Sequence, residues 1–338
     1  MKPSLLIHPT NNRYFNIGDY IQAIAASQYF NRKDFNYVDR EALNQYIGED
    51  TPVIMNGWFM FTNNWPPSEH IIPHFVAFHI NSTATKVLLS DESIKYLKKH
   101  EPIGCRDLKS CDLLKAHGVD AYFSGCLTLT LGRSYHNNGD GKEIYIVDPL
   151  IEPKKEIKSL LSYAWTMAAK FSKVYKIYKA AENHTIMSLL KCVVFYNQYS
   201  KVFGDDILLN AHYPSVYVNN NFESEDAKFD YAKLCLERYS KAKLVITSKI
   251  HCQMPCLAMG TPSLFLKNDN DGISSTCRFD GLIDLYNIIN YNKGDFSSTD
   301  IDLDNGLRCN THLKNKDDHL NMAERLAVSC SNFVKSLN

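Results

Sequence analysis

The sequence predicts an α/β protein in which two parallel-sheet domains face each other across a cleft. Three observations predict this class: short apolar, β-prone runs alternate with helical segments, polar residues follow the runs, and the series occurs twice. The 338 residues are enough for two domains of ordinary size. A polar stretch at 133–142, rich in Asn and Gly, separates the two series. We therefore expect domains at 1–135 and 143–310, followed by a docking helix within 315–338.

The first series begins with a strand at 4–8, a polar loop at 11–19 and a helix at 20–30. The elements expected after it are strands 52–57 and 75–80, a helix at 91–99, a strand at 102–105, a helix ending near 117 and a strand at 119–124. An aromatic-rich loop, 56–67, joins two of these strands. Such loops line sugar sites or pack as local cores, and the sequence leaves both open.

The second series begins with a strand at 143–147, and its end is the most informative part of the chain. After this strand we expect helices through 179 and at 185–199, then a turn and strand within 201–212. A loop at 213–221 and a helix at 226–239 are expected next. A βαβ unit follows, with a strand at 244–247, a polar turn at 248–251, a helix to 259 and a strand at 263–266. The stretch 292–306 reads as a polar linker, and 317–337 as an amphipathic helix.

The composition excludes several classes of protein. Lys plus Arg equals Asp plus Glu at 37 each, so the balance favours no nucleic-acid partner. The N-terminus does not resemble a signal peptide, and no apolar run approaches the ~18 residues of a membrane span, although peripheral attachment stays open. The ten cysteines lie mostly in apolar runs, which predicts buried free thiols and a cytoplasmic location. A zinc site at His251, Cys252 and Cys256 is disfavoured, since Pro255 interrupts the spacing.

The turn at 248–251 carries the polar groups of the last βαβ unit. Ligands of open parallel sheets bind at the carboxyl ends of the strands, so Ser248, Lys249 and His251 are candidate site residues. A cation and an imidazole beside a helix N-terminus suit an anionic substrate. The structural alternative is that Lys249 and His251 are solvated surface residues.

Two further turns in the N-terminal half carry similar groups. Asn16 and Asp19 flank Gly18 at the start of a helix, where backbone N–H groups can hold an anion; the alternative is that the two side chains cap the helix. Arg106 follows a strand and is the strongest candidate anion binder of this half, unless it is a surface residue paired with Asp107.

Three of these motifs resemble the polysaccharide pyruvyl transferase family. They are Thr-Ser-basic-x-His at 247–251, with the following helix and the Gly-x-Pro at 260–262; Arg-Asp-x-x-Ser at 106–110; and Asn-x-Gly-Asp at 16–19. The family usually has Arg where this chain has Lys249, which lacks the bidentate fork of Arg. Many members have an acidic residue where this chain has Cys126. The resemblance covers most of the chain and implies two Rossmann-like domains in the arrangement called GT-B.

The resemblance also implies a reaction and its participants. A pyruvyl unit would pass from phosphoenolpyruvate to a sugar or lipid-linked glycan, forming a cyclic ketal and releasing phosphate, without a cofactor or metal. His251 would be the general acid/base, with Asp19 as the reserve base. The residues expected to bind substrate are Asn16, Gly18, Arg106, Ser110, Ser248, Lys249 and Arg278. Two alternatives stay open: a GT-B glycosyltransferase that uses a nucleotide sugar, and a non-catalytic protein that binds sugars or anions.

Overall fold

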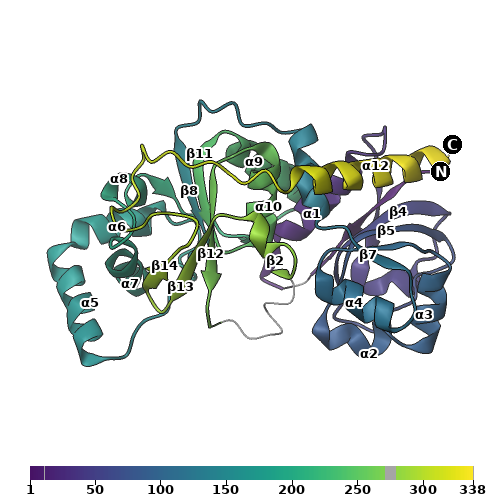
Figure 1. The fold of residues 1–338 in the computed structure, drawn as a ribbon, viewed down its shortest axis with the longest axis horizontal. Helices are drawn as coiled ribbons and strands as arrows, with labels where there is room; N and C mark the ends of the chain where they lie inside the picture. Colours follow the sequence, from purple (N-terminus) through teal and green to yellow (C-terminus); the bar gives the residue numbers. More distant parts are fainter. Residues whose placement is uncertain (11, 271–278, 338) are drawn as a thin grey trace.

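Two separate parallel sheets occupy opposite ends of the molecule (Figure 1). This computed structural model describes residues 1–338 except 11, 271–278 and 338. The N-terminal sheet has the order β4-β5-β6-β7, and the C-terminal sheet has the order β14-β13-β12-β11-β8-β9. All neighbouring strands run parallel except β13 and β14. The predicted α/β class with parallel sheets is therefore confirmed.

The N-terminal sheet is built from short, buried strands joined by helices. Its elements are β4 (Thr51–Phe59), β5 (Ile71–Ile80), α2 (Thr85–Leu88), α3 (Asp91–Lys98), β6 (Ile103–Cys105), α4 (Leu108–Ala116) and β7 (Ala121–Phe123). A parallel pair, β1 (Ser4–Ile7) and β3 (Asn36–Asp39), lies next to this sheet, since the hydroxyls of Ser4 and Thr51 are 2.7 Å apart. Strand β3 is not predicted from the sequence, because its residues, NYVD, lack an apolar run.

The C-terminal sheet contains the predicted βαβ unit. Its strands are β8 (Glu143–Val147), β9 (Ala211–His212), β11 (Ala242–Thr247), β12 (Ser263–Asn268), β13 (Ile288–Asn292) and β14 (Asp295–Ser297). Its helices are α5 (Ile157–Ala169), α6 (Phe171–Ala180), α7 (Leu189–Tyr199), α8 (Asp205–Leu208), α9 (Glu225–Ser240) and α10 (Ile250–Met259). Helix α10 ends at Gly260, whose φ of +75° is the left-handed conformation that favours glycine after a helix. The predicted linker 292–306 was wrong in part, because β14 lies within it and pairs with β13.

A short antiparallel ribbon connects the two halves. It pairs β2 (Tyr14–Asn16) with β10 (Tyr217–Asn219), so that Asn16 lies opposite Tyr217. Both segments were predicted as loops. The prediction was wrong because each strand has three residues and is stabilised by a partner about two hundred positions away, which a local pattern cannot reveal.

Helix α1 (Ile17–Ser27) lies between the two sheets and begins three residues before its predicted start at Tyr20. It packs against α9 and contributes to a buried cluster that also includes residues of α10, such as Met254. Tyr20 adds a polar link, since its hydroxyl donates a hydrogen bond of 2.5 Å to Glu225. The core is therefore continuous from α1 to the C-terminal half.

The last helix, α12 (Leu320–Ser336), returns across the molecule to the N-terminal half (Figure 1). There His74 of β5 stacks on Phe333 at a centroid distance of 4.8 Å and hydrogen-bonds Ser329 at 3.0 Å. None of the helices in the described part of the chain combines the length and apolar character that crossing a bilayer requires.

The cysteines within the described residues are free thiols, and all of them are buried except the half-buried Cys309. Cys277 lies outside the described residues. Burial raises the pKa of Cys105, Cys235 and Cys330, because a thiolate is poorly solvated in an apolar core. The predicted free, buried thiols are confirmed for these positions.

Candidate functional site

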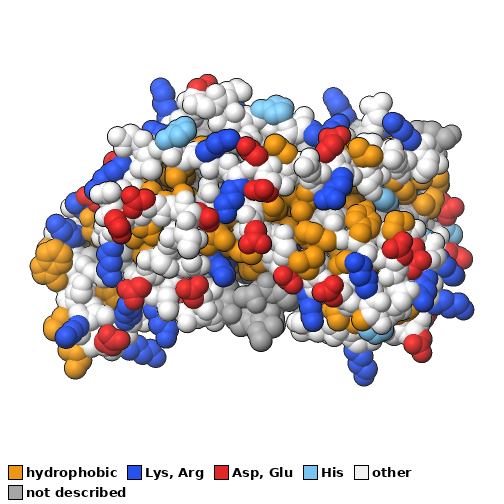
Figure 2. Space-filling model, in the orientation of Figure 1, with side chains coloured by type: hydrophobic (Ala, Val, Ile, Leu, Met, Phe, Trp, Pro, Cys, Tyr) orange, Lys and Arg blue, Asp and Glu red, His pale blue; other side chains and the backbone are white. Residues whose placement is uncertain are grey.

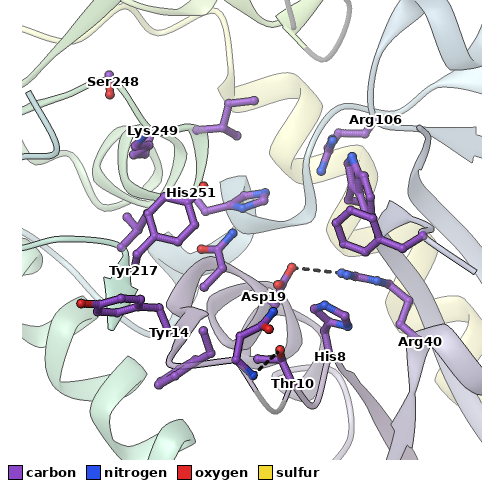
Figure 3. A pocket seen from close by; sticks show the side chains of 17 residues that line it. His8, Thr10, Tyr14, Asp19, Arg40, Arg106, Tyr217, Ser248, Lys249 and His251 are labelled. Atoms are coloured by element: carbon purple, nitrogen blue, oxygen red, sulfur yellow. Dashed lines mark hydrogen bonds and ion pairs between the residues drawn. The ribbon is translucent and has the colours of Figure 1, made fainter. Parts of the chain in front are cut away.

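A pocket of about 420 Å³ lies between the two halves, and 17 residues line it (Figure 3). Five of these residues lie at or just beyond the carboxyl ends of parallel strands, namely His8 after β1, Arg40 after β3, Trp58 in β4, Arg106 after β6 and Ser248 after β11. Although the residue types differ, each of these residues lies at the carboxyl end of a parallel strand. This is the edge at which open parallel sheets bind ligands.

The turn between β11 and α10 lines the pocket as predicted. Lys249 occupies the residue before α10, and its N–H donates to the Thr247 hydroxyl at 3.0 Å. Its ammonium nitrogen lies 5.7 Å from the centre of the Tyr217 ring, within the range of a cation–π contact. The Ser248 hydroxyl donates to the backbone carbonyl of Asp148 at 2.7 Å. Lys249 therefore faces the pocket, whereas the Ser248 hydroxyl holds the turn in place.

Asp148 is a buried carboxyl behind this turn and is not among the residues predicted from the sequence. It directly follows β8, its φ is +47°, and its side chain accepts a hydrogen bond of 2.9 Å from the N–H of Val216. Burial raises the pKa of Asp148, although the positive charge of Lys249 and the Val216 hydrogen bond oppose the rise. Asp148 thus connects the Lys249 turn to the Val216–Tyr217 wall of the pocket.

Asp148→Asn is expected to be at least as stable as the wild type near pH 8. A carboxyl whose folded pKa is raised stabilises the fold fully below its unfolded pKa and loses this contribution as pH rises through the folded pKa. Asn carries no charge to bury, still accepts from the Val216 N–H, and tolerates positive φ. The advantage of the variant in melting temperature should shrink as pH falls from 8 towards 4. A variant that is less stable by the same margin at every pH would contradict this.

Asn16, Gly18 and His251 meet where α1 approaches α10. Asn16 caps α1, since its side-chain oxygen accepts the Gly18 N–H at 3.0 Å. The backbone N–H proposed for anion binding is thus used by the cap. A Cβ at position 18 would lie 2.8 Å from Nδ1 of His251, so only glycine fits without a shift. Gly18 therefore allows the imidazole to lie directly against the start of α1.

Asp19 does not cap the helix but forms an ion pair at the edge of the pocket. Its carboxylate accepts from Arg40 at 3.0 Å, and both side chains are largely buried, at 13% and 5% exposed. The Arg40 guanidinium also lies 5.5 Å from the centre of the Trp58 ring. Asp19 and Arg40 are drawn with this ion pair in Figure 3. Arg40 is not among the residues predicted from the sequence, because the strand before it, β3, lacks an apolar run.

Arg106 lines the pocket and is only 2% exposed, so it is not a surface residue. Its neighbour Asp107 caps α4 and binds the imidazole of His79. Burial would raise the pKa of Asp107, but the hydrogen bond and charge of His79, the positive charge of Arg106 and the Ser110 N–H together lower it. Ser110 is fully buried in this network, where its hydroxyl donates to Asp107 at 3.1 Å. The structure therefore brings Arg106 into the pocket but leaves Ser110 behind it.

Aromatic side chains form much of the remaining wall. Trp58 and Phe61 come from the aromatic-rich loop, and Tyr14 and Tyr217 come from the ribbon. Trp65 of the same loop is instead packed in the core, where its indole N–H donates to Ser93 at 2.8 Å. Part of this aromatic-rich stretch therefore lines the pocket, and part of it packs in the core.

The lining residues carry an excess of positive charge, with three cations, Arg40, Arg106 and Lys249, against one carboxylate, Asp19. The side chains converge from both halves of the chain (Figure 3). Arg278, the other predicted cation, lies outside the described residues. No group of three His, Cys, Asp or Glu side chains that could hold a metal ion occurs within the described ranges.

These features define an α/β protein with a positively charged pocket at the carboxyl ends of its strands. Residues 16–270 match the family model of the polysaccharide pyruvyl transferases, and the chain belongs to this family. The family name identifies it as a transferase family of polysaccharide biosynthesis.

Other comparisons add little to the family assignment. No curated protein matches the chain. Among solved structures, a functionally uncharacterized protein from Klebsiella pneumoniae is similar, with 11% identity and a TM-score of 0.41, over 83% of this chain and 88% of that one.

Proposed function

We propose that the pocket binds phosphoenolpyruvate and that the protein transfers its pyruvyl group to a sugar of a glycan, with release of phosphate. The observation that carries the proposal is the convergence of Arg106, Lys249 and His251 in one pocket of a chain of this family. The donor carries a phosphate and a carboxylate, so it requires more than one cation. The two sheets on either side of the pocket support the GT-B arrangement.

The reaction adds a proton to the methylene carbon of the donor while a sugar hydroxyl attacks the adjacent carbon. Phosphate then leaves with the electrons of its C–O bond, and a second hydroxyl closes the ketal. Of the two protons that the hydroxyls lose, one replaces the proton added to the methylene carbon and the other is taken up by the departing phosphate. A group that both donates and accepts protons is needed beside the bound anion. His251 is the candidate, because its ordinary pKa lies near neutral pH. Asp19 is the reserve base.

The remaining residues have supporting roles in this proposal. Arg106 and Lys249 hold the anionic groups of the donor, and Arg40 is positioned by Asp19 as a further cation. Trp58, Phe61, Tyr14 and Tyr217 offer apolar faces against which a sugar ring can pack. Asn16, Gly18, Ser110 and Ser248 act by shaping the cap and the two turns that carry these groups.

A thermal-shift screen tests the donor directly. Phosphoenolpyruvate should raise the melting temperature in a concentration-dependent manner, and more than pyruvate or phosphate at the same concentration. Nucleotide sugars are the decisive comparison, since a GT-B glycosyltransferase would be stabilised by one of them instead. Stabilisation by a nucleotide sugar but not by phosphoenolpyruvate would overturn the proposal.

Lys249→Ala is expected to weaken phosphoenolpyruvate binding by about 1.5–3 kcal/mol, the contribution of a hydrogen bond to a charged group. Lys249→Arg should retain binding, because Arg supplies the same charge and can hold an anion with two parallel N–H donors. Calorimetry on the folded variants measures both effects, and Lys243→Ala, at an exposed position of the preceding strand, is the control. Unchanged affinity in Lys249→Ala would remove Lys249 from the donor site.

A further inference from the structure

Helix α5 exposes an apolar face to solvent, whereas its inward side combines the partly buried Tyr163 and Met167 with polar residues. Ile157, Leu160, Leu161 and Trp165 are 76%, 52%, 66% and 60% exposed, and their spacing of three and four places them on one face. On the opposite face Ser162 and Thr166 accept hydrogen bonds of 2.8 Å from the Asn197 amide of α7. A surface helix of a soluble protein normally turns its apolar face to the core and its polar face to solvent. The outward face is therefore suited to apolar surroundings.

The same segment carries most of its charge as lysine. Residues 153–180 contain seven Lys and one acidic residue, Glu156, whereas Lys plus Arg equals Asp plus Glu over the whole chain. Two of these lysines lie over aromatic rings, Lys170 over Trp165 and Lys179 over Tyr175, each at 5.5 Å from the ring centre. Lysines thus border the apolar face directly. Figure 2 shows hydrophobic side chains at the left margin, where Figure 1 places α5, surrounded by Lys and Arg.

A basic hollow lies along one flank of α5. It has a volume of about 170 Å³, and Lys154, Lys158, Lys201 and Lys293 line it. Asp295 is the carboxylate nearby, at 2.5 Å from Lys154 and 4.0 Å from Lys201. Four ammonium groups around one hollow outnumber this carboxylate, so the hollow is complementary to an anionic headgroup at the border of the apolar face.

We propose that α5 and the start of α6 form a docking surface for a lipid bilayer that contains anionic lipids. The apolar face would enter the interface between headgroups and acyl chains, and the lysines would contact the lipid phosphates. Apolar burial and electrostatic attraction together are what hold interfacial amphipathic helices on membranes. The proposal goes beyond the proposed function and is independent of the identity of the donor and the acceptor.

Charge complementarity favours a bilayer over a second copy of the chain. A two-fold dimer through α5 would bring the same lysine-rich border of each copy together, and like charges across an interface oppose association. An anionic bilayer instead offers phosphates to every lysine at the border. The lysines thus favour binding to an anionic bilayer and oppose dimerisation through α5.

Vesicle flotation with the full chain tests the proposal. The protein should float with vesicles of phosphatidylcholine and phosphatidylglycerol at low salt, and much less with phosphatidylcholine alone or at high salt. Leu161→Asp should reduce the bound fraction by about tenfold or more, since it places a charge in the apolar face. Lys155→Glu combined with Lys158→Glu should abolish the preference for the anionic lipid. All these positions are exposed, so the melting temperature should stay unchanged.

Two control variants test whether vesicle binding depends on the apolar face of α5. Leu234→Asp changes a Leu that is 41% exposed on α9 and should bind vesicles like the wild type. Trp165→Phe keeps the apolar contact, so it should bind but lose the blue shift of tryptophan emission that the wild type shows on binding. No binding to anionic vesicles at low salt, or equal losses in Leu161→Asp and Leu234→Asp, would overturn the proposal. A dimer in sedimentation equilibrium that Leu161→Asp dissociates would assign the face to a second copy.

Discussion

Replacing His251 with Gln is expected to lower the turnover of pyruvyl transfer by about 10²–10⁴-fold while the donor still binds. A positioned acid/base contributes a factor of this size, and Gln keeps a hydrogen bond but cannot titrate. The imidazole lies against Gly18 at the start of α1, so its position is defined by backbone packing. Phosphate release from phosphoenolpyruvate with a panel of glycan acceptors measures turnover, and calorimetry measures donor affinity separately.

The pH profile distinguishes proton transfer from positioning at this residue. If His251 transfers the proton, the variant should lose the limb of the profile that reports the imidazole pKa. His212→Gln is the control, since His212 is half exposed and pairs with Glu143 on β8. Turnover within a few-fold of wild type, with an unchanged profile, would exclude His251 as the acid/base and direct attention to Asp19.

Replacing Arg106 with Gln is expected to weaken phosphoenolpyruvate binding by about 10²–10⁴-fold. A guanidinium can form two charge-assisted hydrogen bonds with one anion, and each contributes about 1.5–3 kcal/mol. Arg106 is 2% exposed, so the missing contacts cannot be replaced by bulk water. Gln retains an amide donor and part of the side-chain volume, which limits the effect on folding.

Two further variants separate binding from folding at this position. Arg106→Lys keeps the charge but loses the fork, so its affinity should fall between those of the wild type and Arg106→Gln. Arg133→Gln, on the exposed stretch after the first series, should bind like the wild type. If Arg106→Gln melts at the wild-type temperature and binds phosphoenolpyruvate with unchanged affinity, Arg106 does not contact the donor.

The sequence predicts the turns of the pocket better than its walls. Lys249 and His251 could be identified because an apolar strand, a polar turn and a capped helix follow one another locally. Arg106 could be identified for the same reason. Arg40 could not, since β3 has four residues and acquires its place by pairing with β1. Asp148 looks like any acidic residue after a strand until folding buries it behind Lys249.

The contacts made by the ribbon and by the helix caps could not be predicted from local sequence patterns. Tyr14 and Tyr217 face the pocket because β2 and β10 pair across the two halves of the chain. From the sequence, Asn16 fits either a helix cap or an anion ligand. The two differ in where its side-chain oxygen points, and in the structure that oxygen accepts the Gly18 N–H. The signal that could have found Tyr217 is weak: a run of three β-prone residues, Val216, Tyr217 and Val218, within a segment of turns.

The β2–β10 ribbon also affects how the pocket is assembled. Its backbone ladder pairs Asn16 with Tyr217 in the wall of the pocket, and the Ile17 N–H adds a bond of 2.9 Å to the Val216 carbonyl. Widening the pocket at this wall would require main-chain hydrogen bonds to break, because rotating side chains alone would not move the wall. If the pocket binds phosphoenolpyruvate as proposed, the donor would meet cations that are already held at their spacing, and its affinity would not be reduced by the free energy of bringing the two halves together.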